Sequence, residues 1–182
     1  AAARELRPAA RITPDEGVYD EFAARFPYEE TEDQRGAIED VLGDLTGGKS
    51  ADRLICGDVG FGKTEVALRA AFVTAMSGKQ VAVVVPTTLL CRQHYQNFIE
   101  RFKDFPVRVE QISRLVKANA VTDIKKGMKS GDVDIVIGTH ALLAKDVGFR
   151  DLGLLVVDEE QHFGVAHKEQ LKKLKSDVHV LT

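Results

Sequence analysis

Eight consecutive residues match the phosphate-loop pattern G-x-x-x-x-G-K-[ST] at every fixed position: Gly57-Asp58-Val59-Gly60-Phe61-Gly62-Lys63-Thr64. Glycines let the backbone curl so that successive N–H groups face an anion, and a helix that begins at the loop adds its dipole. Lys63 is expected to reach the β- and γ-phosphates of a nucleotide, and Thr64 to place its hydroxyl on Mg²⁺. A glycine-rich turn that matches by chance is the alternative, but its odds are on the order of one in a hundred or lower. The pattern therefore favours nucleotide binding.

A group of acids far downstream could complete this chemistry. The apolar run Leu154-Leu155-Val156-Val157 ends in Asp158, Glu159 and Glu160. An Asp at the tip of a strand can hold Mg²⁺ through water, and the next Glu can polarise an attacking water. Without a phosphate loop, an exposed acidic turn would be the better interpretation. With one, the two adjacent acids favour nucleotide hydrolysis over phosphate transfer to an acceptor.

The elements between these two segments must bring them together, and their pattern alternates from residue 31 onward. We expect helices over residues 31–43, 63–77, 89–102, 118–128 and 168–174, and strands over 54–56, 81–85, 107–112, 135–137, 154–157 and 178–181. Unalternated Val, Ile and Leu runs are typical of parallel strands that are buried on both faces. Right-handed crossovers then predict a doubly wound α/β domain that binds its ligand at the carboxyl ends of the strands.

The first 27 residues differ from the rest, with three of the five prolines and no sustained apolar periodicity. The segment Thr13-Pro14-Asp15-Glu16 resembles a capping box that opens a short helix. We therefore expect a linker and small helix over 1–27 and one main domain over 28–182. Because Thr182 directly follows an apolar strand-like run, the chain is expected to be one piece of a larger protein.

Composition narrows the class of protein further. The chain has 25 Lys and Arg against 28 Asp and Glu, and 44% of its residues are hydrophobic, which is ordinary for a globular protein. Its 2 cysteines give no disulfide framework, and its 5 histidines show no zinc spacing with them. No apolar run approaches the roughly 20 residues of a membrane span. We expect a cytoplasmic protein, and nucleic acid, if bound, must meet a local patch.

Several of these segments resemble superfamily 2 helicases and translocases. Asp158-Glu159-Glu160-Gln161 is similar to their DExx box, Pro86-Thr87-Thr88-Leu89-Leu90 to motif Ia, and residues 138–143 to motif Ic. Residues 26–34, 56–65 and 158–165 resemble, more narrowly, the bacterial transcription-repair coupling factors. This narrower resemblance covers nearly all of the chain from about residue 18. It implies a RecA-like P-loop NTPase domain, the first motor half of a double-stranded DNA translocase related to RecG.

The resemblance also implies roles and partners. Lys63, Asp158 and Glu159 would be catalytic, Thr64 and Asp158 would hold Mg²⁺, and the ATP contacts would extend from the loop to Glu65. A second RecA-like domain with an arginine finger would complete the site, and further domains would bind RNA polymerase and UvrA. The isolated chain is accordingly expected to have little ATPase activity.

The segment Thr31-x-x-Gln34 has two interpretations. In structural terms it is a capping box, with Thr31 as N-cap and Gln34 reaching back to it. By resemblance it is a Q-motif, in which Gln34 contacts adenine and Phe26 or Tyr28 lies near the base.

Polar residues that follow the expected strands could contact DNA phosphates without reading sequence. By resemblance, the duplex-DNA contacts would be Thr88, Arg92, Gln93, Ser113, Arg114, Thr139 and His140. The alternative is that Arg92 is a solvated helix residue and His140 a loop residue.

The predicted function is thus the ATP-binding half of a translocase that removes stalled RNA polymerase and couples transcription to nucleotide excision repair. Two rivals remain open: a RecG-like remodeller of branched DNA, and a catalytically silent module that binds a nucleotide or a protein.

Overall fold

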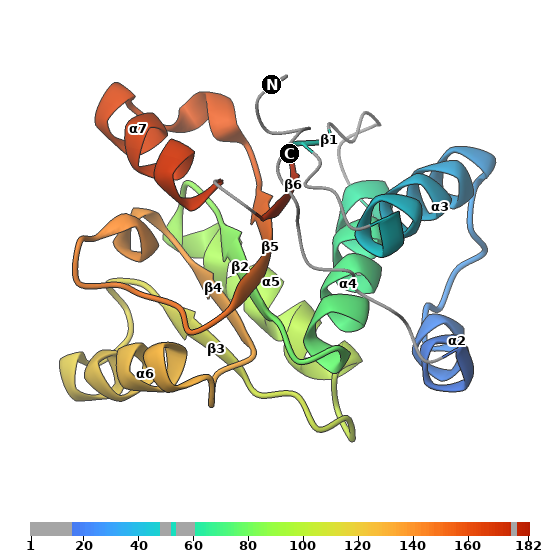
Figure 1. Ribbon diagram of the computed structural model, residues 1–182, viewed down its shortest axis with the longest axis horizontal. Helices are drawn as coiled ribbons and strands as arrows, with labels where there is room; N and C mark the ends of the chain where they lie inside the picture. Colours follow the sequence, from blue (N-terminus) through green and yellow to red (C-terminus); the bar gives the residue numbers. More distant parts are fainter. Residues whose placement is uncertain (1–15, 48–51, 54–60, 176–177) are drawn as a thin grey trace.

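The computed structural model describes residues 16–47, 52–53, 61–175 and 178–182. The described strands form one parallel sheet in the order β1-β6-β5-β2-β4-β3 (Figure 1). The strands are β1 (Asp52–Arg53), β2 (Gln80–Val84), β3 (Val109–Ile112), β4 (Ile135–Gly138), β5 (Leu152–Val157) and β6 (His179–Leu181). The α-helices are α2 (Glu16–Ala24), α3 (Glu32–Gly47), α4 (Phe61–Met76), α5 (Thr88–Arg101), α6 (Ala118–Ser130) and α7 (Val165–Leu174). Two 3₁₀ helices, η1 (His140–Leu143) and η2 (Glu160–His162), follow β4 and β5.

The helices cover both faces of the sheet, as a doubly wound α/β domain requires. One apolar cluster joins α2, α3, α4 and α5 to alternate residues of the central strands, such as Val81 and Val83. The other joins α6, α7 and η1 to the residues between them, such as Ala82 and Val84. All five residues of β2 are buried, because residues 81–84 send apolar side chains to both faces and the Gln80 amide donates to the Met128 and Val133 carbonyls. The predicted fold class is therefore confirmed.

The register of the central strands brings their carboxyl ends to one edge. Val84 of β2 pairs with both Gly138 of β4 and Val157 of β5. The backbone N–H of Asp158 donates to the Val84 carbonyl over 2.9 Å, so the hydrogen bonds between β2 and β5 continue to Asp158. The segments that follow these strands therefore start from one level of the sheet, where the sequence predicts the site.

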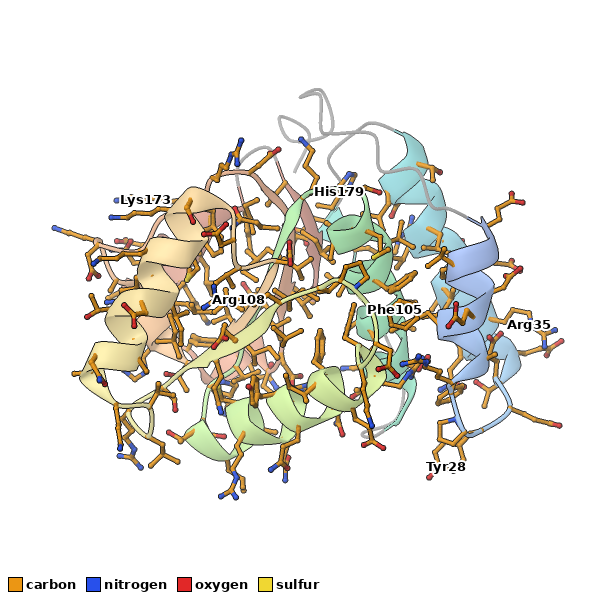
Figure 2. The ribbon with its side chains drawn as sticks, turned by 90° about the horizontal axis from the view of Figure 1, so that it is seen from below. Tyr28, Arg35, Phe105, Arg108, Lys173 and His179 are labelled. Atoms are coloured by element: carbon orange, nitrogen blue, oxygen red, sulfur yellow. The ribbon has the colours of Figure 1, made fainter. Side chains whose placement is uncertain are left out.

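The N-terminal helix α2 packs on the main body through its aromatic side chain. Phe22 is fully buried and stacks on Phe72 of α4, with ring centroids 4.2 Å apart. Phe105, in the loop after α5, lies beside α2 (Figure 2) and meets the Phe22 ring edge-on, with ring centroids 5.8 Å apart. The short helix expected in this region is thus present, while the capping residues Thr13, Pro14 and Asp15 lie outside the described residues.

Most element boundaries fall within three residues of those predicted, and α3 runs to Gly47, four residues beyond its expected end at 43. Two other boundaries are instructive. The first strand is described over Asp52–Arg53, whereas the expected run 54–56 lies outside the described residues. Helix α7 begins at Val165 rather than at residue 168, because Gly164, in an extended conformation, serves as its N-cap. No helix in the described ranges is long and apolar enough to cross a membrane.

Candidate functional site

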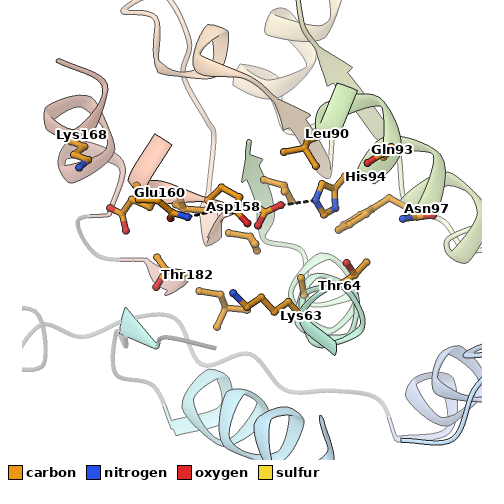
Figure 3. Close-up of a pocket in the computed structure, with 18 residues that line it drawn as sticks. Lys63, Thr64, Leu90, Gln93, His94, Asn97, Asp158, Glu160, Lys168 and Thr182 are labelled. Carbon is orange, nitrogen blue, oxygen red and sulfur yellow. Dashed lines mark hydrogen bonds and ion pairs between the residues drawn. The ribbon is translucent and has the colours of Figure 1, made fainter. Parts of the chain in front are cut away.

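A cavity of about 710 Å³ opens at the carboxyl edge of the sheet, between the starts of α4 and α5 and the end of β5 (Figure 3). It is lined by both segments that the sequence singled out, Lys63 and Thr64 on one side and Asp158 and Glu159 on the other. Its volume lies within the range of small-molecule sites. Two segments that are far apart in the sequence thus meet at one cavity.

Lys63 and Thr64 belong to the first turn of α4, and both are half-buried. This position gives them the positive end of the helix dipole, which favours an anion there. The loop residues Gly57, Asp58, Val59 and Gly60 lie outside the described residues, and Phe61 opens the helix.

Asp158 is held by a histidine that the sequence analysis did not select. His94 Nε2, on α5, lies 3.0 Å from Asp158 Oδ2 (Figure 3). This hydrogen bond, with help from the charge of Lys63, lowers the pKa of Asp158 below its usual value, although burial opposes the shift. The carboxylate is therefore ionised at neutral pH and can only accept, so the proton in the bond belongs to His94 Nε2.

Glu159 has an unusual backbone conformation. Its φ of 56° and ψ of 47° lie in the left-handed region, which costs a residue with a Cβ about 1–2 kcal/mol. Its Oε2 accepts a hydrogen bond from Gln161 Nε2 over 2.5 Å and lies 3.5 Å from His162 Nε2. Such strain is typical of functional sites, where the surrounding structure holds a residue in an unfavourable conformation.

The donor set suits magnesium bound together with a nucleotide. The ionised Asp158 and the Thr64 hydroxyl offer hard oxygens on the same cavity. Within the described ranges, no three His, Cys, Asp or Glu side chains are arranged to hold a metal on their own. Magnesium commonly takes one or two protein oxygens and completes its shell with phosphates and water, so these residues fit it.

Gln34 forms the capping box and lies close to the start of α4. The Thr31 N–H donates to Gln34 Oε1 over 2.9 Å, and the Gln34 N–H donates to Thr31 Oγ1 over 3.1 Å. Gln34 Nε2 lies 3.8 Å from where a Cβ on Gly62 would stand. The capping interpretation is thus confirmed, and Gln34 lies close to Gly62 in the first turn of α4. Phe26 is half-buried, while Tyr28 is exposed at the periphery (Figure 2).

Glu65, which the resemblance places among the ATP contacts, has a side chain that is buried in the core and held by two arginines. It is 1% exposed, and its two oxygens accept hydrogen bonds from Arg69 over 3.0 Å and from Arg101 over 2.5 and 2.8 Å. Arg101 comes from α5, and its guanidinium lies 4.6 Å from the Phe22 ring centroid. Glu65 therefore joins α4 to α5 from within the core.

The residues expected to contact DNA divide into two groups. Arg92, Arg114 and His140 are exposed and Thr88 is half-buried. Ser113 and Thr139 are each 5% exposed. Their hydroxyls accept hydrogen bonds from the backbone N–H groups of Leu115 and Ala141, so these side chains stabilise their own turns.

Gln93, expected among the DNA contacts, is exposed and lines the same cavity as Lys63 and Asp158. The cavity is also lined by residues that the sequence analysis missed or set aside, namely His94, Asn97 and Lys168. Leu90, Gln93, His94 and Asn97 recur at helical spacing, which is the signal that would have placed them on one face of α5. Lys168 is exposed on α7 and lines the cavity, whereas Lys173 of the same helix projects from the surface (Figure 2).

Comparison with known proteins agrees with this geometry. The chain is similar to transcription-repair-coupling factors from Myxococcus xanthus, Staphylococcus haemolyticus and Bacillus subtilis, with 55%, 54% and 51% identity over 98–100% of its length. It spans about 15% of the length of these relatives. A solved structure of RecG bound to a three-way DNA junction superposes with a TM-score of 0.84 at 33% identity, covering 99% of this chain and 24% of that one. Residues 31–181 match the DEAD/DEAH box helicase family, and the chain belongs to this family.

Proposed function

We propose that the chain is the ATP-binding half of a motor that translocates on double-stranded DNA, removes stalled RNA polymerase and couples transcription to nucleotide excision repair. The observation that supports it most is the meeting of Lys63 and Thr64 with Asp158 and Glu159 at one cavity. The similarity to coupling factors over the whole chain supports the specific role.

In this proposal, the residues around the cavity have separate roles in binding and hydrolysing ATP. The loop from Gly57 to Gly62 would bind the phosphates through its N–H groups, and Lys63 would hold the β- and γ-phosphates from the start of α4. Thr64 and Asp158 would hold Mg²⁺, which when bound neutralises charge on the phosphates. Glu159 would orient the attacking water and accept its proton.

Adenine would be bound at the edge of this site. Gln34 Nε2 can donate to the base, while Gln34 Oε1 keeps a lone pair beside the bond it accepts from the Thr31 N–H. Phe26 could cover the base from the segment before α3.

The site would be completed from outside the chain. A second RecA-like domain would supply an arginine finger to the exposed side of the cavity, and its opening and closing would step the pair along duplex DNA. Arg92, Arg114 and His140 would contact the DNA, while domains elsewhere would bind RNA polymerase and UvrA. We therefore expect the 182-residue chain alone to bind nucleotide weakly and hydrolyse it slowly.

The test is the ATPase rate of the full-length protein that contains this chain, with and without linear duplex DNA. We expect stimulation by duplex DNA and a loss of at least about 100-fold in Glu159→Gln, because removing a general base costs this much. Glu169→Gln, an exposed carboxylate on α7, is the matched control and should keep the wild-type rate.

Two results would change the proposal. A rate that duplex DNA does not stimulate would refute the translocase, and an unchanged rate in Glu159→Gln would favour a catalytically silent module. The structural similarity to RecG favours a second candidate, a remodeller of branched DNA. This candidate would be supported if three-way junctions stimulated the ATPase more than linear duplex and if stalled RNA polymerase were not displaced.

A further inference from the structure

His94 makes the one described side-chain contact to Asp158, and its helix holds it firmly. The imidazole is 15% exposed and its Nε2 lies 3.0 Å from Asp158 Oδ2. On the inner side of α5, Cys91 and Phe98 are fully buried, one on each side of His94 in the sequence. The helix therefore has little freedom to roll, and the imidazole has a defined position.

Two further contacts fix α5 along its length. At its start, the Thr87 hydroxyl accepts a hydrogen bond from the Leu90 N–H over 3.2 Å and caps the helix. At its end, Arg101 donates to both oxygens of the buried Glu65 on α4. Because Lys63 and Thr64 lie in the first turn of α4, α5 is tied to the element that would bind the phosphates. His94 thus donates its N–H to Asp158 from a helix whose position is fixed relative to Lys63 and Thr64.

We propose that His94 is a positioning residue that holds the Asp158 carboxylate in the orientation that Mg²⁺ requires. This inference rests on the proposed function, in which Asp158 holds the metal. An Asp side chain with one oxygen fixed has fewer orientations to lose when the metal arrives. Residues that orient metal ligands in this way typically change metal affinity by about 10–100-fold when they are removed.

The experiment measures metal dependence instead of turnover. A fluorescent, non-hydrolysable ATP analogue is titrated with Mg²⁺ in the full-length protein that contains this chain. We expect His94→Leu, which keeps the bulk and removes the donor, to raise the midpoint Mg²⁺ concentration about tenfold. His94→Asn should do the same, because its amide is too short to reach Asp158.

Two variants are expected to behave as wild type. His94→Gln places an amide N–H near the position of imidazole Nε2, so it should restore the midpoint to within about twofold if this donor is what matters. Gln96→Ala removes an exposed side chain from the same helix, outside the cavity lining, and should leave the midpoint unchanged. Binding of the analogue in EDTA should be equal in all five proteins, since His94 acts through the metal ligand.

The possible failures can be told apart. If the wild type binds the analogue without any Mg²⁺ dependence, the proposed function fails. If the wild type depends on Mg²⁺ and both His94→Leu and His94→Asn keep its midpoint, the positioning role is refuted and the proposed function stands. Weaker binding in EDTA in either variant would also refute it, because His94 would then support the nucleotide pocket directly.

Discussion

Replacement of Glu65 by Gln is expected to destabilise the fold strongly while leaving the nucleotide chemistry in place. The Glu65 carboxylate is 1% exposed and accepts hydrogen bonds from two arginines, Arg69 and Arg101. Glu65→Gln keeps the shape of the side chain but removes its charge. The amide N–H₂ of the glutamine is a donor that faces a guanidinium, which is also a donor, so no hydrogen bond can form there. Removing one partner of a buried ion pair costs about 3–5 kcal/mol, since the other charge stays buried without compensation.

The structure argues for the lower end of this range. Arg69 retains a second carboxylate, because its NH1 lies 2.6 Å from Glu30 Oε1. Arg101 has no such second partner in the described residues, and its Nε is already buried without a hydrogen bond. The cost therefore falls mainly on Arg101, and we expect a loss of about 3 kcal/mol in the free energy of unfolding.

A double-mutant cycle isolates the pair. Arg101→Met alone should also destabilise, because it leaves Glu65 with Arg69 only. In Glu65→Gln/Arg101→Met neither charge of the pair remains, so the combined loss should be smaller than the sum of the single losses by about 2 kcal/mol. Urea unfolding of the 182-residue chain, followed by circular dichroism, measures all three. Glu39→Gln, at an exposed position of α3, is the control and should stay within about 0.5 kcal/mol of wild type.

Two outcomes would contradict the buried role of the Glu65 carboxylate. If Glu65→Gln unfolds within about 1 kcal/mol of the control, then its carboxylate is not the buried junction between α4 and α5. If nucleotide binding is weakened at the same time, the expectation from the sequence, that Glu65 contacts ATP, would be right after all.

Three further predictions concern single positions. Glu159→Gly should raise the free energy of unfolding by about 0.5–1 kcal/mol relative to Glu159→Gln in urea titrations, because glycine adopts a φ of 56° without strain; an equal stability would mean that the backbone relaxes in solution. Burial raises the pKa of the Cys91 thiol to about 11, so at pH 8 iodoacetamide should label the peptide that carries Cys91 only after unfolding, and peptide mapping keeps Cys56 separate. Burial raises the pKa of Asp134, which accepts the Arg108 N–H over 2.8 Å, so the folded state binds this proton more tightly than the unfolded state. The free energy of unfolding should therefore fall as the pH rises from the pKa of Asp134 in the unfolded chain to its higher pKa in the folded chain. In thermal unfolding, Asp134→Asn should stabilise the chain at pH 7 but not at pH 3.

The fold could be predicted from the sequence because each strand carries its own signal. Runs such as Val81–Val85 are apolar without alternation, and only burial on both faces explains them. Parallel strands separated by helices leave few topologies, and their carboxyl ends share an edge. That reasoning placed Lys63 and Asp158 at one site with no knowledge of the contacts between them.

The side-chain partners could not be predicted in the same way. Glu65 and Arg101 are 36 residues apart, and His94 and Asp158 are 64 apart. No local pattern joins either pair, since each depends on how α5 lies against its neighbours. A motif therefore predicted the identity of Asp158, but only the packing of α5 identifies what holds its carboxylate.

Helix α5 carries two of the residues expected to contact DNA, Arg92 and Gln93. Arg92 and Gln93 are adjacent, so they point about 100° apart around the helix. Both are exposed, but the cavity lining includes Gln93 and His94 and does not include Arg92. The sequence groups Arg92 and Gln93 on one DNA-facing surface, but adjacent residues of a helix point in different directions and can face two different surfaces. Helix α5 thus carries Arg92 at an exposed position and His94 against Asp158 at the cavity. In the proposed motor, α5 would connect the DNA contact to the nucleotide site.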